Sequence, residues 1–221
     1  MKDYRYKSFW LAEYGDYTPN PVLLGAVSVD VAIIGAGFTG LSTAYNLRKD
    51  DQGLSVAVLE GEVVGFGASG RNGGFSMTLF GLEPAVTKAI FGHQRTVEAH
   101  RYMERAVDYV DELVKQHNLR SDYWFPGFLR AATTPGYAKR IQHDRDILTS
   151  MGISGISWIE ADQIKKEVNS PRFLGGWWEP RSGLLGPAKQ VRELKRLALR
   201  FGVQVFEEPP LQRSGVRRIS H

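Results

Sequence analysis

The sequence predicts an α/β fold with a parallel sheet at its centre, and three observations support this. Residues 29–34 and 55–60 are short apolar runs rich in β-branched residues, which is typical of buried parallel strands. Between them, residues 38–49 place apolar side chains on one helical face (Leu41, Ala44 and Tyr45, beside the stem of Arg48). Each apolar run is followed by a glycine-rich loop. We therefore expect a right-handed βαβ unit whose helix covers one face of both strands.

Downstream of this unit the apolar spacing becomes helical. From about residue 83 to residue 117 apolar side chains recur every three or four positions (Met103, Val107, Val110 and Val114), which predicts an amphipathic helix with a break at Gly92. Further strands are predicted at residues 128–133, 173–179 and 203–206, and helices at residues 135–151, 160–168 and 187–201. Trp177 and Trp178 are neighbours in a strand, so their side chains point to opposite faces. A packed strand is the simpler interpretation, and a substrate-pocket wall is the alternative.

An arm rich in aromatic residues and proline precedes the first strand. Six aromatic residues lie ahead of Pro19 (Tyr4, Tyr6, Phe9, Trp10, Tyr14 and Tyr17). Aromatic side chains at this density are costly to leave in water, and disordered segments are poor in them. We expect residues 1–28 to dock on the body of the protein.

Composition and charge exclude several classes of protein. The 221 residues carry a formal charge of +4, without the basic stripe interleaved with aromatics that a single-strand nucleic-acid binder needs. The absence of cysteine excludes disulfides, thiolate metal sites and a cysteinyl link to a cofactor. No apolar run reaches the ~18–20 residues of a membrane span, and no secretory signal is recognisable. We expect a cytoplasmic protein that binds neither nucleic acid nor a membrane.

The five histidines do not indicate a metal site. They lie at residues 93, 100, 117, 143 and 221, and none stands at a spacing to carboxylates that suggests ligands. Most fall on predicted helix surfaces, so we expect them to be solvated and predict no metal.

The first glycine-rich loop, Gly35-Ala36-Gly37-Phe38-Thr39-Gly40, has the pattern of a dinucleotide-binding turn. Gly35 allows the tight turn, Gly37 lets the backbone approach a pyrophosphate, and Gly40 lets the helix pack on the strand. The helix N-terminus then offers free N–H groups and a partial positive charge to the phosphates. Its position after a strand and before a helix supports this interpretation over a chance match.

Glu60 ends the second predicted strand, 20 residues after Gly40. An acidic residue at this place accepts hydrogen bonds from the adenosine ribose and disfavours a 2′-phosphate, so NADP is not expected. A surface carboxylate at a strand end is the alternative.

The second loop, Gly65-Phe66-Gly67-Ala68-Ser69-Gly70-Arg71-Asn72-Gly73-Gly74, favours a flavin dinucleotide, because nicotinamide enzymes have no common need for it. Its glycines allow the backbone to lie against a ligand. Ser69 can donate to a phosphate oxygen, and Arg71 can neutralise a phosphate or line the flavin edge. By itself such a loop could be a flexible surface turn.

These segments together resemble the D-amino-acid oxidase superfamily of FAD enzymes, and within it the glycine oxidase and gamma-glutamylputrescine oxidase-like branch. The similarity lies in residues 31–45, Leu59-Glu60 and the 65–74 loop, and extends to Lys7-Ser8-Phe9-Trp10, residues 21–23 and residues 182–189. The resemblance implies a glutathione-reductase-like, Rossmann-type FAD-binding domain with part of an α+β substrate domain. The expected division is an arm (1–28), the FAD-binding βαβ unit and second loop (29–80), part of the substrate domain (81–182), a return to the FAD-binding domain (183–212) and a tail (213–221).

The resemblance also implies non-covalent FAD and assigns its contacts. The pyrophosphate would lie on the first loop and the ribose at Glu60, while residues of the second loop would run toward the isoalloxazine. Leu211 would sit where the family places a backbone contact to adenine. The predicted cofactor residues are Gly35, Ala36, Gly37, Phe38, Thr39, Gly40, Glu60, Gly67, Ala68, Ser69, Arg71, Asn72, Gly73, Gly74 and Leu211.

The activity that the resemblance implies is oxidation of the C–N bond of an amine or amino acid. Hydride would pass to the flavin, with oxygen as the expected acceptor, and the sequence identifies no catalytic residue because the cofactor carries the chemistry. Family members are considerably longer than this chain, so a truncated, non-catalytic FAD-binding fragment is the alternative. An NAD-dependent dehydrogenase is disfavoured, because strands and helices do not alternate regularly after Glu60.

Overall fold

The computed structural model describes residues 4–207, which form two compact units. Of the described residues, 4–74, 119–122 and 186–207 belong to the first unit, and Phe75–Asn118 and Tyr123–Leu185 form the second. The chain therefore leaves the first unit after the second glycine-rich loop, rejoins it at residues 119–122, and returns to it for a helix and a strand from residue 186 onward.

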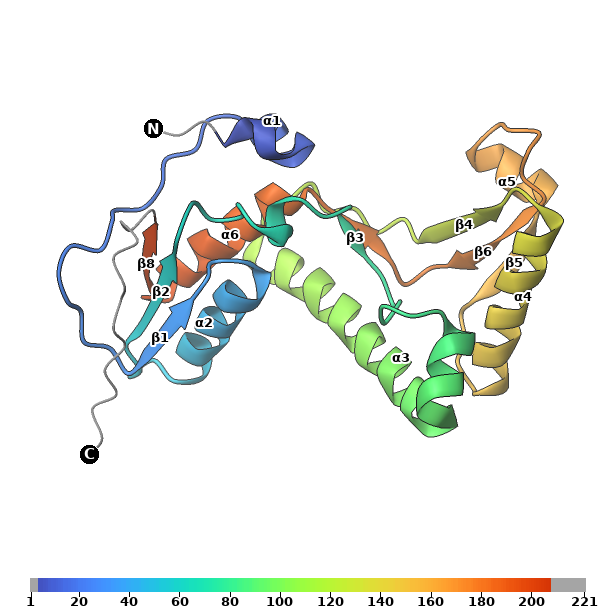
Figure 1. Cartoon of the computed structure of the whole chain (residues 1–221), viewed down its shortest axis with the longest axis horizontal. Coiled ribbons are helices and arrows are strands. Elements are labelled where there is room, and N and C mark those ends of the chain that lie inside the picture. Colours follow the sequence, from blue (N-terminus) through green and yellow to red (C-terminus); the bar gives the residue numbers. More distant parts are fainter. Residues whose placement is uncertain (1–3, 208–221) are drawn as a thin grey trace. The chain divides into compact units, whose positions relative to one another are not determined.

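A three-stranded parallel sheet is the framework of the first unit. Its order is β1 (Val31–Ile34), β2 (Val56–Glu60) and β8 (Gln204–Glu207), as the sequence predicted for all three strands. Helices α2 (Phe38–Asp50) and α6 (Pro187–Arg200) pack against each other beside this sheet (Figure 1). The predicted inner face of α2 is confirmed, because Leu41, Ala44 and Tyr45 are at most 1% exposed.

The first strand departs from the prediction of a buried strand. Its side chains alternate between half-buried and exposed, and Ile34 is 68% exposed. β1 is an edge strand of the described sheet, and its alternating burial shows that only one of its faces is covered. Apolar composition correctly predicts a parallel strand here but not the burial of both its faces.

The arm docks on the first unit, as its aromatic content predicted. It contains a 3₁₀ turn, η1 (Arg5–Lys7), and a short helix, α1 (Phe9–Tyr14), neither of which the sequence analysis predicted. Ser8 caps α1, since its Oγ accepts a hydrogen bond from the Leu11 N–H at 3.1 Å. The same hydroxyl donates to the Gly70 carbonyl at 2.8 Å, which joins the arm to the second glycine-rich loop.

The second unit combines an antiparallel sheet with helices. The sheet order is β4 (Phe128–Ala132), β6 (Gly175–Glu179) and β5 (Ser157–Glu160), and a smaller ladder pairs β3 (Phe75–Ser76) with β7 (Gly183–Leu184). The helices are α3 (Pro84–His117), α4 (Pro135–Ser150) and α5 (Ala161–Glu167). β4, β6, α4 and α5 correspond to predicted elements, whereas β3, β5 and β7 do not.

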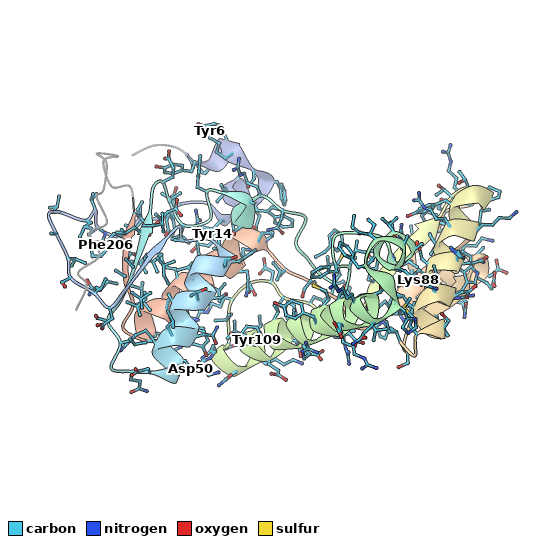
Figure 2. The ribbon with its side chains drawn as sticks, turned by 60° about the horizontal axis from the view of Figure 1, so that its bottom comes forward. Tyr6, Tyr14, Asp50, Lys88, Tyr109 and Phe206 are labelled. Carbon is cyan, nitrogen blue, oxygen red and sulfur yellow. The ribbon has the colours of Figure 1, made fainter. Side chains whose placement is uncertain are left out.

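The core of the second unit lies between its sheet and α4. Ala132, Ile141, Leu148 and Trp177 belong to one buried cluster. Trp177 is thus a packed strand residue, and it also lines a cavity of this unit. Gly92 breaks α3 as predicted, with a φ of +81°. Figure 2 marks Lys88 on the segment before this kink and Tyr109 on the segment after it. No helix among residues 4–207 is long and apolar enough to cross a membrane.

Candidate functional site

The first glycine-rich loop forms a tight turn between β1 and α2. Gly35 has a φ of +96°, which favours glycine, and its N–H donates to the Leu59 carbonyl of β2 at 2.8 Å. A Cβ at Gly40 would overlap the Gly35 carbonyl oxygen. Both glycines are therefore required by the turn itself, whatever binds there.

The N-terminus of α2 is bridged to the second loop. Its N-cap residue, Gly37, has no side chain to cap the helix. Instead, Ser69 Oγ accepts from the Phe38 N–H at 2.9 Å, and a Cβ at Gly37 would lie only 2.8 Å from that hydroxyl oxygen. The N–H groups of the next positions in the first turn, Thr39 and Gly40, lack intrahelical partners and can serve an anion.

Glu60 lies against the first loop, as its spacing predicted. Its Oε2 accepts from the Ala36 N–H at 2.8 Å and its Oε1 from the Glu62 N–H at 3.1 Å. The side chain is half-buried, and each carboxylate oxygen has capacity for a second hydrogen bond. The carboxylate is thus held at the end of β2 with room to accept from a ligand hydroxyl.

The second loop repeats the geometry of the first. Gly65 has a φ of +83°, and a Cβ at Gly70 would overlap the Gly65 carbonyl oxygen, just as Gly40 meets Gly35. The 3₁₀ turn η2 (Ala68–Gly70) follows Gly67, at the position where α2 follows Gly37 in the first loop. The signal for this repetition was present in the sequence, since residues 65–70 also read G-x-G-x-x-G, and the sequence analysis missed it.

Polar side chains shape the end of the second loop. Asn72 Nδ2 donates to the carbonyls of Ala68 and Ser69 at 3.2 and 3.1 Å, and its Oδ1 accepts from the Gly74 N–H at 2.8 Å. Arg71 is exposed, and its Nε donates to the Gly67 carbonyl at 3.2 Å. Asn72 therefore holds the turn, while the exposed guanidinium of Arg71 is available to a ligand.

The arm holds this loop from outside, through residues that the sequence analysis did not assign to the site. Trp10 Nε1 donates to the Asn72 carbonyl at 2.7 Å. Tyr4 packs edge-on against Phe66, with ring centroids 5.7 Å apart. The dense aromatics of the arm were a signal of docking, but not of where the arm docks.

Glu207, at the end of β8, is a fully buried anchor for the arm. Its carboxylate accepts from Lys195 Nζ at 2.9 Å, from the Tyr17 hydroxyl at 2.8 Å, and from the backbone N–H groups of Asn20 at 3.0 Å and Val64 at 2.8 Å. Burial, reinforced by the Glu207 carboxylate, raises the pKa of Tyr17 above its usual range. Burial lowers the pKa of Lys195, and the Glu207 carboxylate opposes that shift.

A match to a protein-family model agrees with these observations. Residues 30–220 match the model described as "DAO: FAD dependent oxidoreductase". The chain belongs to this family of FAD-dependent oxidoreductases. The match covers both units of the described structure and both glycine-rich loops, and FAD is the cofactor of the family.

Individual relatives agree with this assignment. The chain is 30% identical over 194 residues to the probable oxidoreductase OrdL of Haemophilus influenzae, covering 86% of this chain and 44% of that protein. It is 28% identical over 215 residues to gamma-glutamylputrescine oxidoreductase of Escherichia coli, covering 97% of this chain and 48% of that protein. The chain spans about half the length of these relatives.

Solved structures share the fold. A glycine oxidase from Bacillus cereus aligns with a TM-score of 0.63 at 22% identity, covering 82% of this chain and 48% of that one. An L-amino acid deaminase from Proteus myxofaciens aligns with a TM-score of 0.66 at 21% identity, covering 86% of this chain and 41% of that one. The expected α/β fold with an FAD-binding parallel sheet is therefore confirmed.

The residues of the first unit fit the chemistry of FAD. A pyrophosphate needs N–H donors and close backbone approach, which the start of α2 and the glycines of the first loop offer. A ribose needs a hydroxyl acceptor, which Glu60 offers at the end of the neighbouring strand. Leu211, predicted to contact adenine, lies outside the described residues.

The second unit contains a cavity of about 250 Å³. Arg130 and Glu83 form a bidentate ion pair on its wall, with N–O distances of 2.8 and 2.6 Å. Hydrogen bonding to Arg130 lowers the pKa of Glu83. Burial raises the pKa of Glu179, another lining carboxylate, above its usual range.

His100, which also lines this cavity, corrects the prediction that the histidines are solvated. It is 8% exposed, and burial lowers its pKa, which leaves it neutral at pH 7. It falls on the inner side of α3, which a helical pattern alone did not reveal. Residues 4–207 contain no group of three or more candidate ligands that could hold a metal ion.

Proposed function

We propose that this chain binds FAD non-covalently and takes part in oxidising the C–N bond of an amine or amino acid, with oxygen as acceptor. The observation that carries the proposal is the junction of the two glycine-rich loops, where Ser69 meets the α2 N-terminus 2.9 Å from the Phe38 nitrogen. Relatives named as a glycine oxidase, an L-amino acid deaminase and a gamma-glutamylputrescine oxidoreductase support the substrate class.

Each part of the first unit has a role in this proposal. Gly35, Ala36, Gly37, Phe38, Thr39 and Gly40 would line the pyrophosphate, because the helix start attracts negative charge. Glu60 would accept hydrogen bonds from the adenosine ribose. The second loop would lead toward the isoalloxazine through Gly67, Ala68, Ser69, Arg71, Asn72, Gly73 and Gly74.

The bound flavin would supply the electron acceptor for hydride leaving the substrate carbon. The protein's residues would hold that cofactor in place. Ser69 uses its lone pairs to cap α2 and keeps its hydroxyl proton for a phosphate oxygen. Arg71 places a positive charge at the exposed edge of the same loop, where it balances negative charge of the cofactor.

A visible spectrum of the purified chain after incubation with FAD tests the proposal. Flavin bands retained after desalting, with FAD released into the supernatant on heating, would support it. A Glu60→Gln variant should bind FAD more weakly than a Glu167→Gln variant, which changes an exposed glutamate of the second unit. A colourless protein that takes up no FAD would refute the proposal for this chain.

Turnover separates an active oxidase from the alternative of a non-catalytic FAD-binding fragment. Hydrogen peroxide release from the FAD-loaded chain should be screened with primary amines and amino acids. Peroxide formation that depends on substrate would establish oxidase activity with oxygen as acceptor. FAD binding with neither peroxide release nor flavin bleaching under anaerobic conditions would favour the fragment.

A further inference from the structure

The segment at the start of α3, residues 79–91, exposes large apolar side chains. Gly81 turns the chain ahead of the helix and Gly92 breaks the helix, with φ values of +74° and +81°. Six residues of the segment are both exposed and apolar: Leu79, Phe80, Leu82, Val86, Ile90 and Phe91. Ile90 is 61% exposed, and Val86 lies one helical turn before it on the same face. Exposed apolar residues gathered in this way mark an interaction surface.

The charge available on and beside this segment is positive. Glu83 is the only acidic residue between residues 75 and 97, and Arg130 binds it through two hydrogen bonds of 2.8 and 2.6 Å. Lys88 and Arg95 are exposed, and neither forms an ion pair within the part of the chain that the structure describes. Figure 2 labels Lys88 on this part of the ribbon. The segment therefore combines apolar side chains with unpaired cations and offers no unpaired carboxylate.

This combination favours an anionic membrane surface over a protein partner. Interfacial helices bury leucine and phenylalanine side chains at the level of the lipid headgroups and carry lysine and arginine beside them. Protein interfaces, by contrast, are poor in lysine and enriched in tyrosine, tryptophan and methionine. A second copy of the chain is disfavoured as well, because a twofold dimer through this face would bring Lys88 and Arg95 toward the same cations of the other copy.

We propose that residues 79–91 dock on the surface of an anionic lipid bilayer. Ile90 and Phe91 enter the headgroup region together with the other apolar side chains of the segment. Lys88 and Arg95 meet the lipid phosphates. The contact is peripheral, because the segment lies in the interface and does not cross the bilayer.

A membrane was not expected from the sequence, because no apolar run is long enough to span one. A surface segment needs no such run, since only one of its faces enters the lipid. The inference is independent of the proposed function, because residues 79–91 contain none of the residues proposed to hold FAD.

Co-sedimentation of the full chain with lipid vesicles tests the proposal. Binding to phosphatidylcholine vesicles that contain about 30% phosphatidylglycerol should be roughly tenfold or more tighter than binding to pure phosphatidylcholine, since each of the two cations contributes about fivefold. Ile90→Ser/Phe91→Ser should weaken binding to the anionic vesicles by roughly tenfold or more, because it removes apolar area that enters the lipid. Lys88→Gln/Arg95→Gln should weaken it by a similar factor.

Matched controls are available elsewhere on the second unit. Val168→Ser/Leu174→Ser also replaces two exposed apolar side chains. Lys166→Gln/Arg172→Gln also removes two exposed cations, with the same change in net charge. Both control variants should bind the anionic vesicles as the unaltered chain does.

Several results would overturn the inference: no sedimentation with anionic vesicles, equal affinity for neutral ones, or binding that the control variants weaken as much as the variants within residues 79–95 do. Light scattering without vesicles checks the remaining alternative. Self-association that Ile90→Ser/Phe91→Ser abolishes would mean that a second copy covers this face, and it would also overturn the inference. If a variant fails to fold by circular dichroism, the comparison of the two vesicle types on the unaltered chain decides.

Discussion

Replacing Lys195 by methionine should destabilise the first unit strongly, because it leaves the Glu207 carboxylate buried without its cation. The Glu207 side chain is fully buried and that of Lys195 is 10% exposed, with 2.9 Å between Nζ and Oε1. Removing one partner of a buried ion pair typically costs ~3–5 kcal/mol. A free-energy change of ~1.4 kcal/mol corresponds to a factor of ten in an equilibrium constant. The lower value therefore increases the equilibrium constant for opening of the structure around Glu207 about a hundredfold.

Hydrogen exchange measures this cost where it arises. The backbone N–H groups of Asn20 and Val64 both donate to Glu207, so they report the opening of the anchor directly. The double variant Lys195→Met/Glu207→Gln should lose less stability than the two single variants lose in sum, because no unpaired charge is then left buried. The control, Lys165→Met, removes an exposed pair with Asp162 and should cost below ~1 kcal/mol. Protection of Asn20 and Val64 that falls less than threefold in Lys195→Met would refute the reasoning.

Three further predictions concern the loop, the second unit and the sheet edge. Trp10→Phe removes a hydrogen bond to the Asn72 carbonyl, so the FAD dissociation constant should rise about fivefold, ~1 kcal/mol, in a fluorescence titration; an unchanged constant would contradict this. Burial and then Glu83 raise the pKa of Asp144, so its ionisation weakens the folded state at neutral pH. Asp144→Asn should therefore raise the melting temperature at pH 7, and the gain should vanish as the pH falls below the unfolded-state value of 3.8; a gain that persists at pH 3 would count against it. Ile34→Lys should reduce self-association in light scattering, because Ile34 is exposed on an edge strand; a monomeric parent chain would refute this.

The sequence predicted the first unit better than the second for a physical reason. In the first unit, strand, turn and helix are adjacent in the chain, and glycine is required where the backbone turns back on itself. Local pattern therefore specifies the turn. The antiparallel sheet of the second unit pairs β4 with β6 across more than 40 residues, and β5 has no alternating pattern of burial. Its pairing is set by packing against α4, which periodicity does not reveal.

Two glutamates show the limit of what the sequence predicts about burial. Glu60 and Glu207 end neighbouring parallel strands and are directly paired in register. Glu60 was singled out by its distance from Gly40, and it lies half-buried beside the first loop. Glu207 has the same place on the next strand, yet it is fully buried under the arm. The two carboxylates differ because different segments cover the two strand ends. The arm residue Tyr17, which contacts Glu207, lies 190 positions away from it, so local sequence pattern does not reveal the contact.

The two glycine-rich loops are physically coupled, so in the proposed FAD site they would act together. Each places a glycine of positive φ five residues before a glycine whose Cβ would overlap its carbonyl oxygen. Ser69 of the second loop caps the helix that the first loop begins, and the arm fixes the second loop through Ser8 and Trp10. A displacement of the arm would therefore reach the start of α2 through two hydrogen bonds, one at Gly70 and one at Ser69. On this argument, the arm would contribute to the FAD affinity of the proposed site by holding the second loop in place.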